Sequence, residues 1–213
     1  MKVALRRSSL RALAVAAIAA ATVVGLAPTA SAAAHDITFD CRAKTPIGDQ
    51  QATLTQTVDA TAPATVAPGG ALDIVVDPTP NDIPGEINGN KIKEVKNFTL
   101  KVPIPANSTY VSADLTGGSG LGPTPPEIKV ENGIAVVTFP GPIAGGAQFE
   151  LPTITAHLTA GQSGAIESKL YGASYDDPGL TFTAVISSII GDVEAPTSCF
   201  PNPNPVLTTT TIG

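Results

Sequence analysis

Residues 128–139 read IKVENGIAVVTF, and this stretch decides the fold class by predicting a β-hairpin. Apolar and charged residues alternate in IKVE before the turn, and apolar residues dominate IAVVTF after it. Asn132 and Gly133 suit a tight two-residue turn, because both tolerate the positive φ angles that such a turn requires. Strands joined this closely indicate an antiparallel sheet.

Apolar and polar residues alternate in a similar way along most of the chain. This period of two residues is that of a strand with one buried face, because successive strand side chains point to opposite faces. Gly and Pro, 20 of each, supply turns between these segments, and no amphipathic helical pattern of ten residues follows residue 32. We therefore expect an all-β protein, a β-sandwich of about nine to ten strands. The expected strands cover residues 37–41, 52–58, 72–76, 98–104, 110–115, 128–130, 134–139, 149–158, 165–171 and 180–190, with 193–199 as a last candidate.

The first 32 residues have the pattern of a secretory signal peptide. Four cations and no acid occupy residues 1–11, an apolar run of about 15 residues follows, and small residues surround position 32. Cleavage is expected between Ala32 and Ala33. The Arg6-Arg7 pair leaves twin-arginine export open beside the general secretory route. The apolar run is shorter than the roughly 20 residues that span a bilayer, so we expect no transmembrane span in the mature protein.

Cys41 and Cys199 are the only two cysteines of the chain. An even number of cysteines in an exported protein predicts a disulfide. This bridge would join the first strand to the last and close a loop of about 160 residues. We expect one domain over residues 33–200, with two closely docked sandwiches as the alternative, and a Pro/Thr-rich tail over residues 201–213.

Charge excludes several classes of partner. The chain has 12 Lys and Arg, four of them before residue 12, so eight remain in the mature protein against 18 Asp and Glu. Nucleic acids and anionic lipid surfaces bind cationic patches, and so we expect no nucleic-acid partner. Half of the remaining cations, Lys91, Lys93, Lys96 and Lys101, lie close together. They indicate either a solvated strand edge, where lysines discourage edge pairing, or a contact surface for an anionic polymer.

Three segments carry a family resemblance. Residues 64–76 (ATVAPGGALDIVV), 102–113 (VPIPANSTYVSA) and 133–151 (GIAVVTFPGPIAGGAQFEL) resemble the turn-and-strand motifs of prokaryotic immunoglobulin-like domains, with Asn107 where Gly is usual. The whole chain also resembles small, uncharacterised β-sandwich proteins that actinobacteria secrete. The resemblance implies an immunoglobulin-like β-sandwich, and it implies no activity, cofactor or catalytic residue.

Residues that support chemistry are sparse. The histidines are His35, near the predicted cleavage site, and His157, within a predicted strand. Ser119 and Ser163 lie between glycines, but the G-x-S-x-G spacing of a serine nucleophile is not met. Acidic pairs at residues 73 and 77 and at 176 and 177 are typical of turns and solvated faces, with a weak Ca²⁺ site as the alternative. We assign no catalytic, cofactor or metal residues.

Three hypotheses for function remain. The first is an exported, non-catalytic immunoglobulin-like module that contacts an extracellular or cell-envelope protein or surface. Its contact regions would be the four lysines and the loops at residues 117–126 and 176–179. The second is a binding protein that holds an apolar envelope molecule, such as a lipid, between the two sheets of the sandwich. An inter-sheet cavity larger than a packed core allows would distinguish this hypothesis. The third is an enzyme with an unrecognised site.

Overall fold

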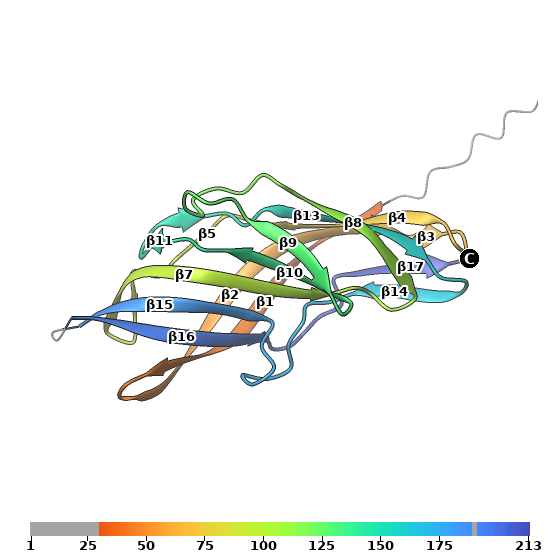
Figure 1. Ribbon diagram of the computed structural model, residues 1–213. Helices are drawn as coiled ribbons and strands as arrows, with labels where there is room; N and C mark the ends of the chain where they lie inside the picture. The colour runs from red at the N-terminus through yellow and green to blue at the C-terminus, as the bar shows by residue number, and fades with distance from the viewer. Residues whose placement is uncertain (1–29, 189–190) are drawn as a thin grey trace, which may run out of the picture.

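The computed structural model describes residues 30–188 and 191–213, which form strands, turns and loops (Figure 1). Ten strands make up the main sheet in the order β8-β13-β4-β2-β1-β16-β15-β7-β10-β9, and all neighbours in this order are antiparallel. In chain order these strands are β1 (Ala30–Thr45), β2 (Gly48–Pro63), β4 (Ala71–Pro78), β7 (Asn90–Pro103), β8 (Ser108–Thr116), β9 (Glu127–Glu131), β10 (Ile134–Phe139), β13 (Thr153–Ala160), β15 (Leu180–Ser188) and β16 (Gly191–Pro201).

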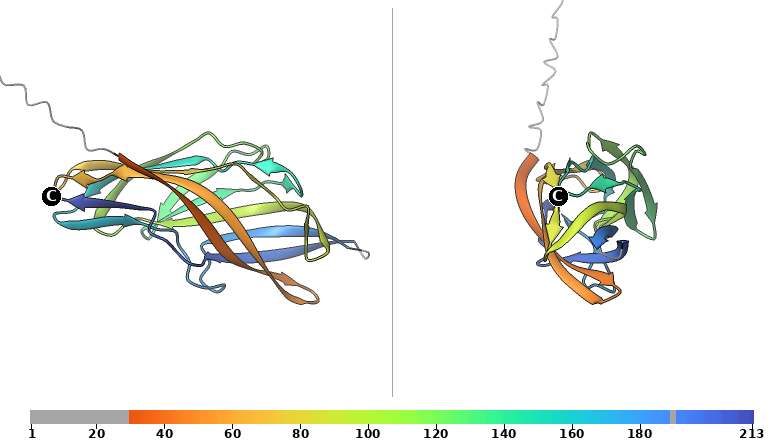
Figure 2. Two further views of the ribbon diagram at one scale, coloured as in Figure 1. Left: turned by 180° about the vertical axis from the view of Figure 1, so that it is seen from behind. Right: turned by 90° about the vertical axis from the view of Figure 1, so that its left-hand side faces the viewer.

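Short strands cover both ends of the main sheet. At one end β6 (Glu86–Ile87) and β11 (Ile143–Ala144) pair with β7, and β5 (Asn81–Asp82) pairs with β12 (Gln148–Phe149). At the other end lies a small sheet in the order β14 (Gly164–Ser168), β17 (Thr208–Ile212) and β3 (Thr65–Val66). The long β1–β2 and β15–β16 hairpins both project away from this small sheet and from the C-terminus (Figures 1 and 2).

The main sheet curls through 319° and nearly closes into a barrel. The all-β expectation is confirmed, but the expected immunoglobulin-like β-sandwich is wrong. A sandwich consists of two separate sheets. Here hydrogen-bonded pairing continues without a break through all ten strands, from β8 at one edge of the sheet to β9 at the other. Alternating sequences suit both architectures, because strands of a sandwich and of a barrel each have one buried and one exposed face.

A bulge in β7 contributes to this curvature. Asn97 and Phe98 of β7 together lie opposite Phe182 of β15, where the pairing register shifts. Asn97 has a φ of 57°, the left-handed conformation that Asn tolerates better than most residues. Because a bulge bends its strand and increases the twist, it helps a sheet to roll up.

The predicted hairpin over residues 128–139 is present as β9 and β10. Asn132 and Gly133 have φ angles of 51° and 76°, as a turn of this type requires. A second Asn-Gly turn, at Asn88 and Gly89, joins β6 to β7 with φ angles of 52° and 76°.

Inward side chains form three apolar clusters along the barrel. One surrounds the disulfide, the second fills the end near β5 and β11, and the third lies under the small sheet. Their buried members are Ile37, Phe39, Cys41, Val58, Ala60, Leu170, Cys199 and Leu207 in the first cluster; Ile83, Ile92, Val95, Phe98, Leu121, Phe139, Ile143 and Phe149 in the second; and Ala62, Leu72, Ile74, Leu158, Ala160, Ile166 and Ile212 in the third.

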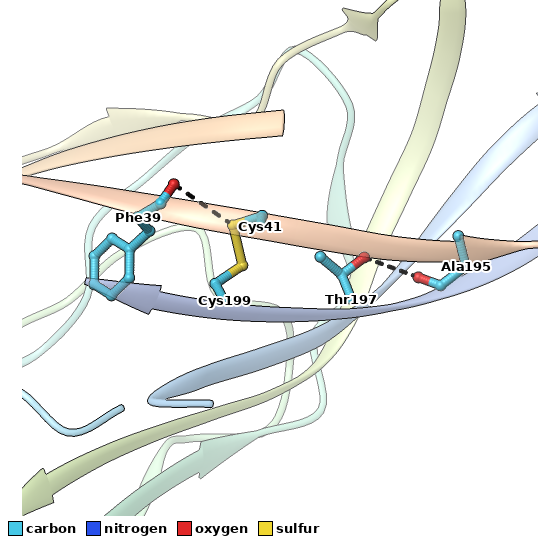
Figure 3. The surroundings of a disulfide bond; sticks show 5 residues. All are labelled: Phe39, Cys41, Ala195, Thr197 and Cys199. Atoms are coloured by element: carbon cyan, nitrogen blue, oxygen red, sulfur yellow. Dashed lines mark hydrogen bonds between the residues drawn. A yellow bond between two sulfur atoms is a disulfide. The ribbon is translucent and has the colours of Figure 1, made fainter. Parts of the chain in front are cut away.

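The predicted disulfide between Cys41 and Cys199 is present and joins β1 to β16 (Figure 3). The two cysteines face each other directly in the pairing register, with their Cα atoms 4.1 Å apart. The Cys41 sulfur also lies 3.9 Å from the carbonyl oxygen of Phe39. That approach is a contact only, because a disulfide sulfur has no proton to donate.

The predicted signal peptide lies mostly outside the described residues. β1 begins at Ala30 and pairs with β2 along its whole length. Cleavage between Ala32 and Ala33 would remove its first three residues and leave the pairing from Ala33 onward in place. The cleavage site stays a prediction.

The predicted Pro/Thr-rich C-terminal segment, residues 201–213, contains a strand. Thr208–Ile212 form β17, which pairs antiparallel with β14 and parallel with β3. Buried and exposed residues alternate along this strand, so that Thr210 and Ile212 point into the protein. The repeated threonines therefore continue the strand pattern of period two, although their composition is typical of a linker.

Candidate functional site

The interior of the barrel contains a cavity of about 430 Å³. Most of the side chains that line it are apolar, and β7 alone contributes an unbroken series of inward residues from one end of the barrel to the other. These are Ile92, Val95, Phe98, Leu100 and Val102. Ligand cavities of this size are lined mainly by apolar side chains with few polar groups, and the lining of this cavity fits that description.

Small inward residues leave the space open. Ala113 of β8, Ala135 of β10, Ala156 of β13 and Ala184 of β15 all line the cavity. Larger side chains at these positions would fill the interior, because protein cores normally pack to the density of organic crystals. The cavity thus follows from the distribution of alanine over four strands.

Two charged residues occur among the described residues that line the cavity. Asp82, next to Ile83 and Pro84, lies at the end near β5, and Lys169 lies at the end near the small sheet. Ser168 also lines the cavity, and its hydroxyl shares a hydrogen bond of 2.7 Å with the hydroxyl of Thr208. Asp82 is exposed, and Lys169 pairs with the exposed Glu167 at 3.3 Å, so neither charge is buried in the cavity.

A seam runs along the barrel wall where β8 and β9 form the two ends of the strand order. Tyr110 and Ala113 line the cavity from β8, and Ile128 lines it from β9. Residues 117–126 connect the two strands, and Leu121 from this connection is buried in the cluster near β11. This loop, which we expected to be a contact region, is thus anchored to the barrel.

The four lysines that we expected to form a contact surface lie on β7, which is an interior strand and not an edge. Lys93 pairs with Asp192, and Lys96 pairs with Glu194 at 2.6 Å. The pKa values of Lys93 and Lys96 are raised, mainly because each lysine donates a hydrogen bond to its acidic partner. The Nζ atom of Lys101 lies 5.3 Å from the centre of the Tyr171 ring.

Lys91 is the fourth residue of this group, and it is exposed where β7 begins. Because acids of β16 already neutralise Lys93 and Lys96, the group presents less free positive charge than its sequence indicates. Its role as a contact surface stays a prediction.

The expected contact loop at residues 176–179 is held against the outside of the barrel. Arg42 of β1 donates a hydrogen bond of 2.7 Å to Asp176, and its guanidinium lies 4.8 Å from the centre of the Tyr175 ring. The Tyr171 hydroxyl donates to Asp177 at 2.8 Å, and this bond is the main cause that raises the pKa of Tyr171. Both carboxylates therefore have partners within the protein.

A row of three side chains crosses the outer face of β4, β13 and β8. His157 lies in the middle, with Nδ1 2.7 Å from Asp73 and Nε2 3.0 Å from Asp114. Hydrogen bonds to Asp114 and then to Asp73 raise the pKa of His157, because both favour the charged imidazolium. The sequence identified His157 as a strand residue, but its partners come from strands far away in the chain.

Within residues 30–188 and 191–213, no group of three or more His, Cys, Asp or Glu side chains is placed to hold a metal ion. The same residues include no helix that is long and apolar enough to cross a membrane.

These features define an all-β protein with a nearly closed antiparallel barrel, an internal apolar cavity and a disulfide in the barrel wall. No family model matches the chain, and neither does any curated protein. Among solved structures, it is similar to a crystal structure from Corynebacterium diphtheriae, an actinobacterium, described as a "putative membrane anchored protein". The TM-score is 0.56 at 16% sequence identity, and the match covers 85% of this chain and 38% of that chain.

The chain therefore spans well under half the length of that protein. Identity this low supports a shared fold alone. The expected likeness to actinobacterial proteins holds at that level, with no family assigned, and the disulfide supports a location outside the cytoplasm.

Proposed function

We propose that this protein is an exported, non-catalytic binding protein that holds an apolar molecule of the cell envelope inside its barrel. The observation that carries the proposal is the cavity of about 430 Å³ with largely apolar walls. The second of the three hypotheses from the sequence placed such a molecule between two sheets, and the present proposal places it inside the barrel.

An energetic argument supports an occupant for this cavity. At roughly 24 cal/mol per Å³, an empty apolar cavity of 430 Å³ would cost about 10 kcal/mol. The whole free energy of unfolding of a typical protein is about 5–15 kcal/mol. A bound apolar molecule would restore the missing van der Waals contacts and offset most of this cost.

Location supports an envelope molecule as the ligand. The disulfide and the predicted signal peptide both favour a place outside the cytoplasm, in the envelope or the medium. Lipids are the abundant apolar molecules of the envelope, and the nearly closed barrel wall would shield most of a bound lipid from water. The sparse polar groups of the lining favour retention of a ligand over reaction with it.

Native mass spectrometry of the protein from a culture that exports it would test this proposal. We expect the native mass to exceed the denatured mass by one small molecule, which organic extraction removes and a long-chain lipid restores. Ala113→Phe, which fills the cavity from β8, should abolish this added mass. Ser112→Phe, on the exposed face of the same strand, is the matched control and should retain it.

If the wild-type protein takes up no apolar molecule, or if Ala113→Phe carries the same added mass as Ser112→Phe, the proposal is wrong.

One observation favours surface contact as a second candidate function. Ile47, which lies between β1 and β2, has an exposed fraction of 87%. The hairpin that these two strands form projects from the barrel (Figure 2). An exposed apolar side chain of this kind would suit contact with an envelope protein or surface. Sedimentation with isolated envelopes should fall for Ile47→Ser if this contact exists and stay unchanged if it does not.

A further inference from the structure

We propose that a ligand enters the cavity through a window in the barrel wall between β2 and the segment that connects β4 to β6, and that Asn81 is the gating residue of this window. The inference rests on the proposed function and adds the route by which the cavity is filled and emptied. Three observations carry it: the exposure of the lining residues, the short ladder between β2 and β4, and the hydrogen bonds that cross the gap.

Exposure identifies the position of the window. Of the described residues that line the cavity, four are exposed, and they lie in two short stretches. These are Thr53 and Thr55 of β2, and Asp82 and Pro84 of the segment between β4 and β6. The described lining residues along the seam between β8 and β9 and at the end near the small sheet are all buried or half-buried. The cavity therefore comes closest to solvent between these two stretches.

The pattern of lining residues also distinguishes a rim from a wall. Strands in the wall contribute mostly alternate residues, because successive side chains point to opposite faces. β2 instead contributes the consecutive residues 53–56, and the facing segment contributes residues 81–84. Consecutive lining residues occur at the other end too, at 102–105 and 168–170, but none of these is exposed.

The window exists because the ladder between β2 and β4 is short. β2 pairs with β4 only from Val58 to Thr61. Next to this ladder, the N–H of Thr79 donates a hydrogen bond of 3.0 Å to the carbonyl oxygen of Thr57. Beyond that bond, no backbone pairing in the described part of the chain joins residues 51–56 to the facing segment.

Two side-chain amides cross this gap instead. Nδ2 of Asn81 donates hydrogen bonds to the carbonyl oxygen of Thr55 at 2.7 Å and to Oε1 of Gln56 at 3.1 Å. Nε2 of Gln56 in turn donates to the carbonyl oxygen of Thr79 at 2.8 Å. An amide side chain moves between rotamers without a change in its backbone. Rotation of the Asn81 side chain therefore removes two of these bonds and uncovers the window.

The segment that carries Asn81 stays in place during this rotation. β5, which contains Asn81, pairs with β12 on its other side. The N–H of Ile83 donates to the carbonyl oxygen of Ala147 at 3.0 Å, and the carbonyl oxygen of Ile83 accepts from the N–H of Gly146 at 2.8 Å. The Ile83 side chain is buried in the cluster near β11. Only the side of the segment that faces β2 therefore depends on side-chain amides.

Stopped-flow fluorescence with N-phenyl-1-naphthylamine, a neutral apolar dye, would test the gate by measuring uptake and release. We expect Asn81→Ala to accelerate both rates about tenfold, because the closed window loses hydrogen bonds that the open window already lacks. Asn204→Ala is the matched control. The Asn204 amide also donates to the carbonyl oxygen of a lining residue, Leu170 at 2.8 Å, but at the end near the small sheet. This variant should change neither rate.

A second experiment blocks the window directly. Thr55→Cys places a thiol on its rim, and Val111→Cys places one on β8, which borders the seam, at a residue that is 61% exposed and outside the cavity lining. Polyethylene glycol maleimide would react with these added thiols, because Cys41 and Cys199 are buried and bonded to each other. The label should slow dye uptake and release in Thr55→Cys and leave both rates unchanged in Val111→Cys.

Several outcomes would overturn the inference. Faster exchange in Asn204→Ala, or slowing by the label in Val111→Cys alone, would place the entrance elsewhere in the barrel. Faster release without faster uptake in Asn81→Ala would mean that Asn81 binds the dye and does not gate its entry. In each of these cases the proposed function would still hold if Ala113→Phe blocks dye binding. If the wild-type protein binds neither the dye nor a long-chain lipid, the proposed function fails and this inference fails with it.

Discussion

The Nδ1 atom of His157 lies 2.7 Å from an oxygen of Asp73, and its other ring nitrogen lies 3.0 Å from Asp114. Both nitrogens therefore face carboxylate oxygens, which only accept hydrogen bonds. A neutral imidazole has one N–H to donate, whereas the imidazolium has two. This row connects the outer faces of β4, β13 and β8, and β8 borders the seam in the barrel wall.

The first prediction concerns pH. Because the pKa of His157 is raised in the folded protein, its contribution to stability is fully present below about pH 6.5, the ordinary pKa of histidine. That contribution is lost as the pH rises through the folded-state pKa. The unfolding midpoint of the wild-type protein should exceed that of His157→Gln at about pH 5.5, and the difference should shrink by about pH 9. Urea unfolding across this range measures it, and a difference that is independent of pH would contradict it.

The second prediction concerns the disulfide. Replacing both Cys41 and Cys199 with alanine should lower the free energy of unfolding by up to about 5 kcal/mol, because the bridge closes a very long loop in the unfolded chain. Reductant should lower the unfolding midpoint of the wild-type protein and leave that of the double variant unchanged. Equal midpoints for the two proteins under oxidising conditions would show that the bridge adds no stability.

The third prediction concerns the loop between β8 and β9. Leu121 has an exposed fraction of 6% and packs in the cluster near β11. Leu121→Ala should cost about 2–3 kcal/mol and make the loop more sensitive to proteases. Thr124→Ala, at an exposed position of the same loop, should change neither quantity. Similar behaviour of the two variants would mean that the loop is not anchored by Leu121.

The fourth prediction concerns β17. Ile212 is 7% exposed and belongs to the cluster under the small sheet, whereas the neighbouring Thr211 is exposed. Ile212→Ala should reduce the free energy of unfolding by about 2–4 kcal/mol, and Thr211→Ala should leave it within about 0.5 kcal/mol of the wild type. Chemical denaturation of both variants tests this, and a neutral Ile212→Ala would indicate that the C-terminal strand is dispensable.

Local features of the fold were predictable from the sequence. The turn at Asn132 and Gly133 depends on two neighbouring residues with special backbone freedom, and the structure confirms it. The pairing of Cys41 with Cys199 was also predictable, because the chain has no other cysteine. In both cases the information lies in residue identity alone.

The closure of the sheet was not predictable in this way. Alternation of apolar and polar residues predicts that a strand has one buried face. It does not predict whether that face packs against a second sheet or against the far wall of a barrel. The lysines of β7 illustrate the difficulty, because β7 pairs with β15, and the paired residues are 80 to 96 positions apart in the chain. The sequence around Lys93 and Lys96 contains no sign of this partner or of the acids on β16 that neutralise them.

The cavity could not be predicted from the sequence either. Ala113 and Ala156 leave space only because β8 and β13 place both residues on the inside of one barrel. A composition rich in small apolar residues made a cavity conceivable as an alternative, but its position depends on which strands are neighbours.

The disulfide occupies the two middle strands of the ten, β1 and β16, with four strands on either side. The seam between β8 and β9 is where the two outermost strands meet, so the covalent bond and the opening lie on opposite walls. Along the strand pairs that the structure describes, no ladder of backbone hydrogen bonds joins β8 to β9. The circumference of the barrel can therefore widen at the seam without breaking any ladder, while the bridged wall keeps its register. A change in circumference at the seam would therefore leave the pairing of β1 with β16 intact.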